Sequence, residues 1–285
     1  MTDIGKLDQY GLLHAAGEDA RAFLHAQLTN DIENLAPGQA RYAGWCSAKG
    51  RLLATFLVVP FAGGFLLQLS RDLVPAVAKR LSMFILRSKV KLSDVTGQWA
   101  QLGIWGAGAG APLSVSESDG LVTVRIDSDR SLVFASEGRY VPHVPNVPTA
   151  SAGDWALAEV RAGRPLIGET TQDQFVPQMV NLELSGGVDF KKGCYPGQEI
   201  VARAQYRGAV KRRMYRLRGG PLQAGQDLYS DDAPGQAGGT VGTVVNTAGN
   251  ESLAVLQTSA VEGKSPIRAQ PQAAALEILP LPYAQ

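Results

Sequence analysis

The spacing of apolar residues predicts two helices and a hairpin in the first third of the chain. Apolar residues recur at helical spacing over Glu18–Leu28. A second helix, over Asp72–Leu86, has an apolar face that includes Phe84 and Ile85. Between these helices, Gly63-Gly64 separates the apolar runs Leu52–Pro60 and Phe65–Leu69, a pattern that predicts a β-hairpin.

Short strands dominate the rest of the pattern. Four are predicted next, at Val90–Asp94, Trp99–Trp105, Leu121–Ile126 and Ser131–Ala135. A proline-rich connector follows at Val141–Ser151, and then a helix over Trp155–Gly163. Beyond Arg216, glycine and proline divide four more strands, Leu228–Ser230, Gly239–Asn246, Leu253–Gln257 and Glu277–Leu279. This order predicts an α+β protein with mostly antiparallel sheets and a small C-terminal β-barrel or sandwich.

A chain of 285 residues exceeds a typical single domain. The connector and the change to short strands divided by glycine and proline suggest three parts. We expect an N-terminal α+β part over 1–140 and a second α+β part over 141–215. The C-terminal β-barrel would then occupy 216–285, with Gly219-Gly220-Pro221 at its boundary.

Composition narrows the class of protein. Hydrophobic residues make up 45% and charged residues 19%, as in globular proteins that bury a core. The net charge of +1 gives no global reason to expect direct binding to nucleic acid or to a membrane. The first residues lack a signal-peptide pattern, and Pro60 interrupts the most apolar window, Leu52–Leu69. We therefore expect a soluble, cytoplasmic protein.

Several common chemistries are disfavoured. The two cysteines, Cys46 and Cys194, form no disulfide framework or zinc motif, and the histidines His14, His25 and His143 form no metal-binding motif. The glycine-rich segment Gly106–Gly110 lacks the Lys-Ser/Thr pair of a phosphate-binding loop. We expect no stably bound metal and no serine-hydrolase triad.

The most distinctive segment is KKGCYPGQE, Lys191–Glu199. It places Cys194 after Gly193 and near two lysines, ahead of a helix-like segment. Nearby cations or a helix N-terminus favour a thiolate, the form in which cysteine is a nucleophile or a ligand. A small buried cysteine in a turn is the alternative that the local sequence leaves open.

KGCYPGQE resembles the KGC-[YF]-x-GQE signature of the YgfZ-like proteins. That family is related to the folate-binding T-protein of glycine cleavage and is linked to the maintenance of iron–sulfur enzymes. Four more blocks resemble family segments in the expected order, Phe23–Ile32, Cys46–Ala54, Glu159–Pro165 and Phe175–Leu182. The resemblance implies a T-protein-like α+β body in two interleaved parts around a central cavity, followed by a C-terminal barrel.

The resemblance also implies a tetrahydrofolate-type ligand in the cavity. A flat pteridine needs apolar faces and a few placed polar groups, and its glutamate tail needs cations. The candidate ligand-binding residues are Asn30, Tyr42, Trp45, Gln178, Asn181, Arg203 and Arg207. The alternative, equally open for each of them, is that the aromatic residues belong to the core and the arginines to a solvated helix face.

Two departures from T-protein bear on activity. Ala54 and Thr55 stand where T-protein has an aspartate implicated in methylene transfer, and neither can act as a carboxylate. Arg161 stands where T-protein has a glutamate that grips the pterin edge, and a guanidinium donates hydrogen bonds only. The sequence therefore leaves open whether folate binds and whether the protein is an enzyme.

Within the motif, the resemblance makes Cys194 the candidate reactive group, with Lys192, Gly193, Tyr195, Gly197, Gln198 and Glu199 in support. Its thiolate could ligate iron transiently or attack a disulfide, but one cysteine cannot hold a cluster alone. Gln198 and Glu199 could equally cap backbone donors of the loop. The basic run Arg203–Arg218 is expected to be a solvated stretch leading into the barrel, with contact to an acidic client or tRNA as the alternative.

The leading hypothesis is a folate-binding accessory protein for the assembly or repair of iron–sulfur enzymes, including tRNA-modifying ones. Its expected partners are those client enzymes and a tetrahydrofolate. The alternatives are a folate-dependent transferase of the aminomethyltransferase type and a non-catalytic binding scaffold. The sequence does not set the oligomeric state.

Overall fold

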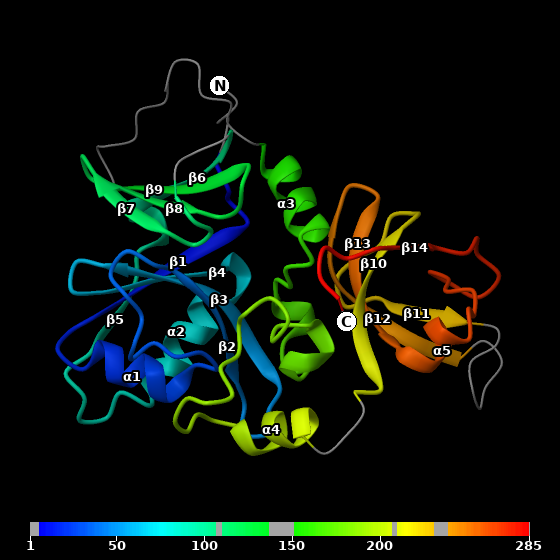
Figure 1. Ribbon diagram of the computed structural model, residues 1–285, viewed down its shortest axis with the longest axis horizontal. Coiled ribbons are helices and arrows are strands. Elements are labelled where there is room, and N and C mark those ends of the chain that lie inside the picture. Colours follow the sequence, from blue (N-terminus) through cyan, green and yellow to red (C-terminus); the bar gives the residue numbers. More distant parts are fainter. Residues whose placement is uncertain (1–5, 107–109, 137–150, 207–209, 231–238, 285) are drawn as a thin grey trace.

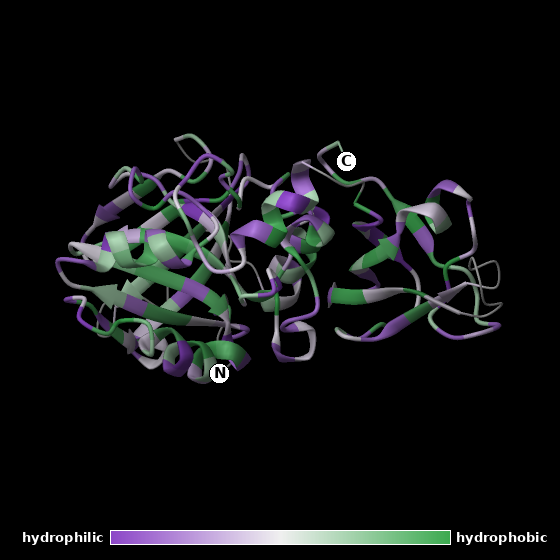
Figure 2. Ribbon diagram, turned by 90° about the horizontal axis from the view of Figure 1, so that it is seen from below, coloured by the Kyte–Doolittle hydropathy of each residue, from purple (hydrophilic) through white to green (hydrophobic). Residues whose placement is uncertain are grey.

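Three antiparallel sheets form the framework of the molecule (Figure 1). The computed structural model describes residues 6–106, 110–136, 151–206, 210–230 and 239–284. The predicted connector Val141–Ser151 therefore lies, apart from its last residue, outside the described residues, as does the middle of Gly106–Gly110. In Figure 2, hydrophobic residues follow the strands of the large N-terminal body and of the separate C-terminal sheet.

The first sheet has the strand order β2-β3-β4-β1-β5. Its strands are β1 Tyr10–Ala16, β2 Arg41–Cys46, β3 Leu52–Phe61, β4 Gly64–Ser70 and β5 Lys91–Asp94. The predicted hairpin is confirmed as β3–β4, but its turn lies one residue earlier than expected. Ala62 and Gly63 make this turn with φ of 47° and 73°, the positive values that a tight hairpin with right-handed strand twist requires. Gly64 already belongs to β4, where a Cβ would lie 2.3 Å from the carbonyl oxygen of Ala15.

Two helices share one hydrophobic cluster with this sheet. They are α1, Ala20–Gln27, and α2, Val74–Ser82, which follows the 3-10 turn Arg71–Leu73. The prediction that the second helix reaches Leu86 was wrong. After Ser82 the backbone bonds run three residues back, as from Phe84 to Leu81, and Leu86 takes φ of 44°, which no α-helix contains. Phe84 consequently lies 44% exposed instead of on the buried face.

A four-stranded sheet covers the opposite face of the first sheet. Its order is β6-β9-β8-β7, with strands β6 Trp99–Trp105, β7 Val115–Ser118, β8 Leu121–Arg125 and β9 Arg130–Ser136. The short 3-10 turn Thr96–Gln98 leads into it. Leu12 and Leu57 of the first sheet share a second hydrophobic cluster with Phe134, so the two sheets form a sandwich above the helical layer.

The middle of the chain runs between the N-terminal body and the C-terminal sheet (Figure 1). It contains α3 Ala152–Arg161, the 3-10 turns Glu169–Thr171 and Pro177–Val180, and α4 Gln198–Tyr206. Ser151 caps α3 because its Oγ accepts a 3.0 Å bond from the Asp154 amide. Gly163, with φ of 66°, ends the helix as its glycine predicted.

The C-terminal sheet has the order β11-β12-β13-β10-β14. Its strands are β10 Arg212–Arg218, β11 Asp227–Ser230, β12 Gly239–Ala248, β13 Glu251–Gln257 and β14 Glu277–Leu279, and α5 Thr258–Glu262 follows β13. Isolated bridges join Arg268 to Tyr229 and Ala275, which curls the sheet. The four strands expected beyond Arg216 are confirmed. The stretch Arg212–Arg218 is itself an internal strand, so the expected boundary at residue 216 falls within β10.

Candidate functional site

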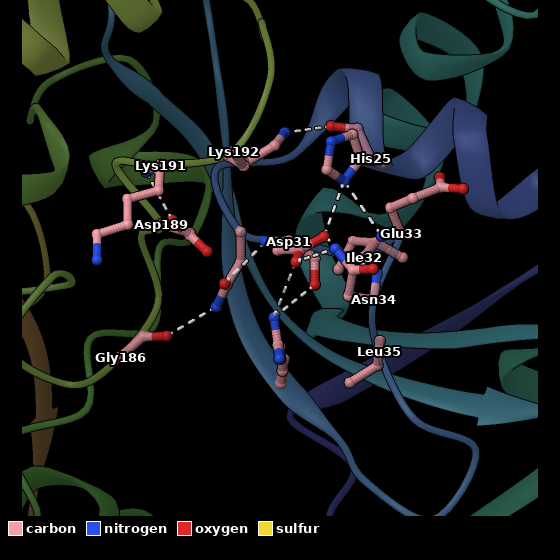
Figure 3. Close-up of polar contacts among 12 residues, drawn as sticks. His25, Asp31, Ile32, Glu33, Asn34, Leu35, Gly186, Asp189, Lys191 and Lys192 are labelled. Atoms are coloured by element: carbon pink, nitrogen blue, oxygen red, sulfur yellow. Dashed lines mark hydrogen bonds and ion pairs between the residues drawn. The ribbon is translucent and has the colours of Figure 1, made fainter.

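Cys194 is exposed in the loop that leads into α4, and Lys192 fastens this loop to α1 (Figure 3). The Nζ of Lys192 donates a 2.7 Å bond to the carbonyl oxygen of Leu28 and a second bond to that of His25. Both carbonyls lie at the C-terminal end of α1, so the ammonium lies at the negative end of the helix dipole. Burial lowers the pKa of Lys192 to about 8, against the opposing influence of Asp31, Asp189 and Cys194. The motif lysine therefore positions the loop that presents the thiol.

A close approach at Gly197 fixes the course of the loop, whereas Gly193 makes only an ordinary contact. A Cβ at Gly193 would lie 3.7 Å from Nε2 of His25, whose Nδ1 accepts a 3.1 Å bond from the Glu33 amide. At Gly197, where φ is 78°, a Cβ would lie 2.4 Å from the Ser47 carbonyl oxygen and 2.6 Å from the Gly50 Cα. Glycine at 197 is thus required both by the backbone conformation and by the packing against the turn after β2.

The remaining motif residues divide between the core and the surface. Tyr195 is buried, and its ring centroid lies 4.9 Å from the Nζ of Lys192. Gln198 is half-buried and Glu199 is exposed at the start of α4. Neither side chain forms a hydrogen bond with another described residue, so their role as caps stays a prediction.

A small cavity of about 50 Å³ lies between the two N-terminal sheets and α3. Its wall includes Tyr42, Thr55, Trp155, Glu159 and Arg164. Glu159 is the acidic residue of this wall. Its Oε1 accepts bonds of 2.7 Å from Arg130 and 2.8 Å from Arg164. The Arg164 guanidinium lies 5.5 Å from the centroid of the Tyr42 ring, whose hydroxyl has its pKa raised to about 12 by burial.

A larger open groove of about 560 Å³ adjoins this cavity, because Tyr42 and Ser185 line both. Arg41 and Lys191 place cationic side chains along the groove. Phe190 and Tyr206, also in its wall, pack edge-to-face with their ring centroids 6.1 Å apart. The groove therefore combines cations with aromatic surface. One of its residues, Lys191, precedes Cys194 by three positions in the chain.

The structure separates the predicted ligand-binding residues into two groups. Asn30 and Tyr42 lie at the groove, although the Asn30 amide also donates 2.7 Å bonds to the backbone oxygens of Tyr42 and Gly186. Trp45, Gln178 and Asn181 line neither the cavity nor the groove, and their role in ligand binding stays a prediction.

These three side chains already have structural partners. Trp45 is 1% exposed in the core, with Phe84 edge-on to its ring at 6.4 Å. The Gln178 amide donates a 2.7 Å bond to the Val201 carbonyl, and the Asn181 amide a 2.8 Å bond to that of Met214. They join the 3-10 turn at 177–180 to α4 and β10.

The described residues include only one of the two predicted tail-binding arginines, Arg203. Arg203 is exposed on α4 and lies outside the walls of both the cavity and the groove. Arg207 lies outside the described residues. The cations that do line the groove, Arg41 and Lys191, were not among the predicted ligand-binding residues.

The two departures from T-protein have clear structural counterparts. Thr55 lines the cavity, but its hydroxyl donates to the Pro165 carbonyl at 3.1 Å and accepts from the Ile167 amide at 3.2 Å. Arg161 points out of the cavity and donates bonds of 3.0 and 3.2 Å to Glu251 in β13. The carboxylate on the cavity wall belongs instead to Glu159. Its position one helical turn after Trp155 was the available sequence signal.

Within the described ranges, His, Cys, Asp and Glu side chains form no group of three or more that could hold a metal ion. None of the helices in those ranges has the length and apolar character that a membrane crossing demands.

Comparison with known proteins identifies the family. The family model for the GCVT N-terminal domain matches residues 2–123. The tRNA-modifying protein YgfZ of Klebsiella pneumoniae (strain 342) is 32% identical over 300 residues, covering 97% of this chain and 91% of its own. The chain belongs to the YgfZ family. The YgfZ of Edwardsiella ictaluri (strain 93-146) is 30% identical over 303 residues, with 98% and 91% covered.

Solved structures give the fold. The glycine cleavage aminomethyltransferase T of Bartonella henselae aligns with a TM-score of 0.64 at 14% identity, covering 89% of this chain and 78% of that one. The resemblance to the YgfZ family and the T-protein-like α+β fold predicted from the sequence are therefore both confirmed.

Proposed function

We propose that this YgfZ-family protein is a folate-binding accessory protein for the assembly or repair of iron–sulfur enzymes, including tRNA-modifying ones. The observation that carries the proposal is the junction of cavity and groove at Tyr42. Glu159 stands on the cavity side of this junction, and the groove side carries two cations, Arg41 and Lys191, against one acid, Asp189. A folate has a pterin edge of hydrogen-bond donors at one end and carboxylates at the other, which matches this order of charges.

The size of the cavity constrains how folate would bind. Pockets for ligands of this size usually exceed ~300 Å³, so a cavity of about 50 Å³ must widen to admit a pteridine. The groove of about 560 Å³ already suits the benzoyl and glutamate parts.

Thiol chemistry falls to Cys194 and not to Cys46. Burial, with a smaller influence from Asp173, raises the pKa of the Cys46 thiol to about 12, which keeps it protonated. Cys194 is exposed in a loop that Lys192 holds in place. In this proposal Cys194 acts on a client enzyme, as a transient iron ligand or in thiol–disulfide exchange.

Aminomethyl transfer is disfavoured because Thr55, whose hydroxyl is bonded to the backbone, replaces a carboxylate at the cavity wall. The other alternative, a non-catalytic binding scaffold, differs from our proposal because its function would not require the thiol of Cys194.

Calorimetric titration with tetrahydrofolate tests the ligand. We expect micromolar binding by the wild type and by Cys194→Ser, because the thiol is not part of the pocket. Glu159→Gln should weaken binding about tenfold or more, since it replaces an anionic acceptor. Arg161→Gln, two residues away but outside the cavity, is the matched control and should bind like the wild type. Absence of binding by the wild type would refute the folate part of the proposal.

A further inference from the structure

The turn after α2 exposes an unusual amount of apolar surface. Met83 is 68% exposed, Phe84 44% and Leu86 89%. Single exposed apolar residues are ordinary, but three within four consecutive positions form a patch that water solvates poorly.

This turn has a defined shape. The Ser88 amide donates a 2.7 Å bond to the Ile85 carbonyl, and the Phe84 ring meets the Trp45 ring edge-on at 88°. Leu86 has φ of 44°, a left-handed conformation that is unfavourable for a bulky side chain. The fold therefore holds Leu86 outward in a strained conformation, and such strain is commonly kept for a function.

Cations surround the apolar side chains. The chain from 73 to 93 contains Lys79, Arg80, Arg87, Lys89 and Lys91 but no acidic residue, although the whole protein has a net charge of only +1. Lys89 pairs with Glu18 at 2.6 Å. Lys79, Arg80 and Arg87 are exposed and have no ion pair with a described acid. We call Lys79, Arg80, Met83, Phe84, Leu86 and Arg87 the α2-turn surface.

We propose that the α2-turn surface docks a partner protein through a segment that carries apolar side chains flanked by Asp or Glu. The unpaired cations provide the charge complement for the acids, and Met83 and Leu86 provide the apolar anchors. RNA is less well matched, because two of the three exposed apolar side chains are aliphatic and cannot stack on bases. This inference does not depend on folate binding or on Cys194.

The α2-turn surface is connected to the Cys194 loop through a short series of contacts. Phe84 packs on Trp45, whose backbone pairs with Leu28, and the Leu28 carbonyl binds Lys192. A protein docked at this surface would therefore contact the layer of the fold that anchors the thiol loop.

Site-specific photo-crosslinking in cells tests the proposal on the full-length protein. Benzoylphenylalanine is placed at position 86 and, as a control, at Ile278, an exposed apolar residue of β14. We expect position 86 to crosslink to one protein, at a segment in which mass spectrometry finds apolar residues beside acids. Adducts only to RNA, to lipid or to a second copy of this chain would overturn the proposal, as would adducts no more abundant than those at position 278.

Binding of the purified crosslinked protein supplies the second readout. Leu86→Asn removes the anchor while keeping a residue that tolerates positive φ, so the variant should melt like the wild type and bind at least about tenfold more weakly. Arg87→Glu should weaken binding most at low salt, and an acid-to-lysine change in the partner segment should restore it. Unchanged affinity of both variants would overturn the proposal, and Ile278→Asn should bind like the wild type.

Discussion

The Nζ of Lys192 donates a 2.7 Å hydrogen bond to the carbonyl oxygen of Leu28, 164 positions earlier in the chain. The bond joins the Cys194 loop to the end of α1. It gives the motif lysine a positioning role, since its ammonium is committed to backbone carbonyls and lies over the Tyr195 ring.

Replacing Lys192 by Met should loosen this loop. The loss of bonds from a charged donor is expected to lower the free energy of unfolding by about 1–3 kcal/mol and to speed amide exchange over 190–196. Chemical denaturation and hydrogen exchange measure the two effects. Lys191→Met is the matched control, because Lys191 is exposed, and it should be nearly neutral.

The same lysine gives a pH dependence. Its pKa is lowered by burial from 10.5 to about 8 in the folded protein, so between these values the unfolded chain binds more protons. Raising the pH through that window therefore favours the folded state. The stability of the wild type relative to Lys192→Met should rise between pH 8 and pH 10.5, and a constant difference would contradict the burial of this charge.

Gly197→Ala should be strongly destabilising. Positive φ alone costs a non-glycine residue of order 1–2 kcal/mol, and contact with Ser47 and Gly50 adds overpacking of about 1–3 kcal/mol. Gly186→Ala separates the two effects, since Gly186 has φ of 76° but nothing within 4 Å of an added Cβ. Equal losses of stability in thermal melts of the two variants would show that the 197 contact is unimportant.

The two cysteines should differ sharply in reactivity. Native protein is expected to react rapidly with a thiol reagent such as DTNB at one site, Cys194, because Cys46 is buried and its pKa is raised to about 12. Cys194→Ser should abolish the fast phase, and denaturation should release the second thiol. A fast phase that persists in Cys194→Ser would be inconsistent with the buried position of Cys46.

Arg161 should matter for stability at neutral pH. Burial alone would raise the pKa of Glu251, but the bond from Arg161, together with the charges of Arg161 and Arg216, holds it below its ordinary value. Such a group stabilises the fold above pH 4.5, its unfolded value, and loses that contribution as the pH falls through its folded value. Arg161→Gln should cost about 1 kcal/mol at pH 7. The difference from the wild type should shrink in denaturation curves below pH 4.5.

Periodicity and turn residues predicted most of the elements, because these signals are local. Strands β1, β2, β7 and β10 and helix α5 were not predicted, and β10 shows the physical reason most clearly. Its sequence RRMYRLR looks solvated, yet Arg213 pairs with Glu183 and Arg218 with Glu251 and Glu277. These acids lie far from β10 in the sequence, so only the tertiary fold reveals why an internal strand can carry so many cations.

The site was predicted less completely than the fold. The motif identified Cys194, but polar type alone cannot tell a ligand-binding amide from one that binds the backbone, as Gln178 and Asn181 do. Glu159 and Arg161 are two residues apart on α3, which places them on opposite faces of the helix. Only the packing of α3 decides that Glu159 faces the cavity and Arg161 the C-terminal sheet.

The most direct test of the proposed function is the activity of an iron–sulfur tRNA-modifying enzyme in cells that lack this protein. The cells are supplied with wild type or Cys194→Ser at matched levels, and the modified nucleoside is quantified by mass spectrometry. Our account predicts restoration by the wild type and none by a correctly folded Cys194→Ser. Full restoration by Cys194→Ser would contradict a role for the thiol and leave the protein a binding scaffold.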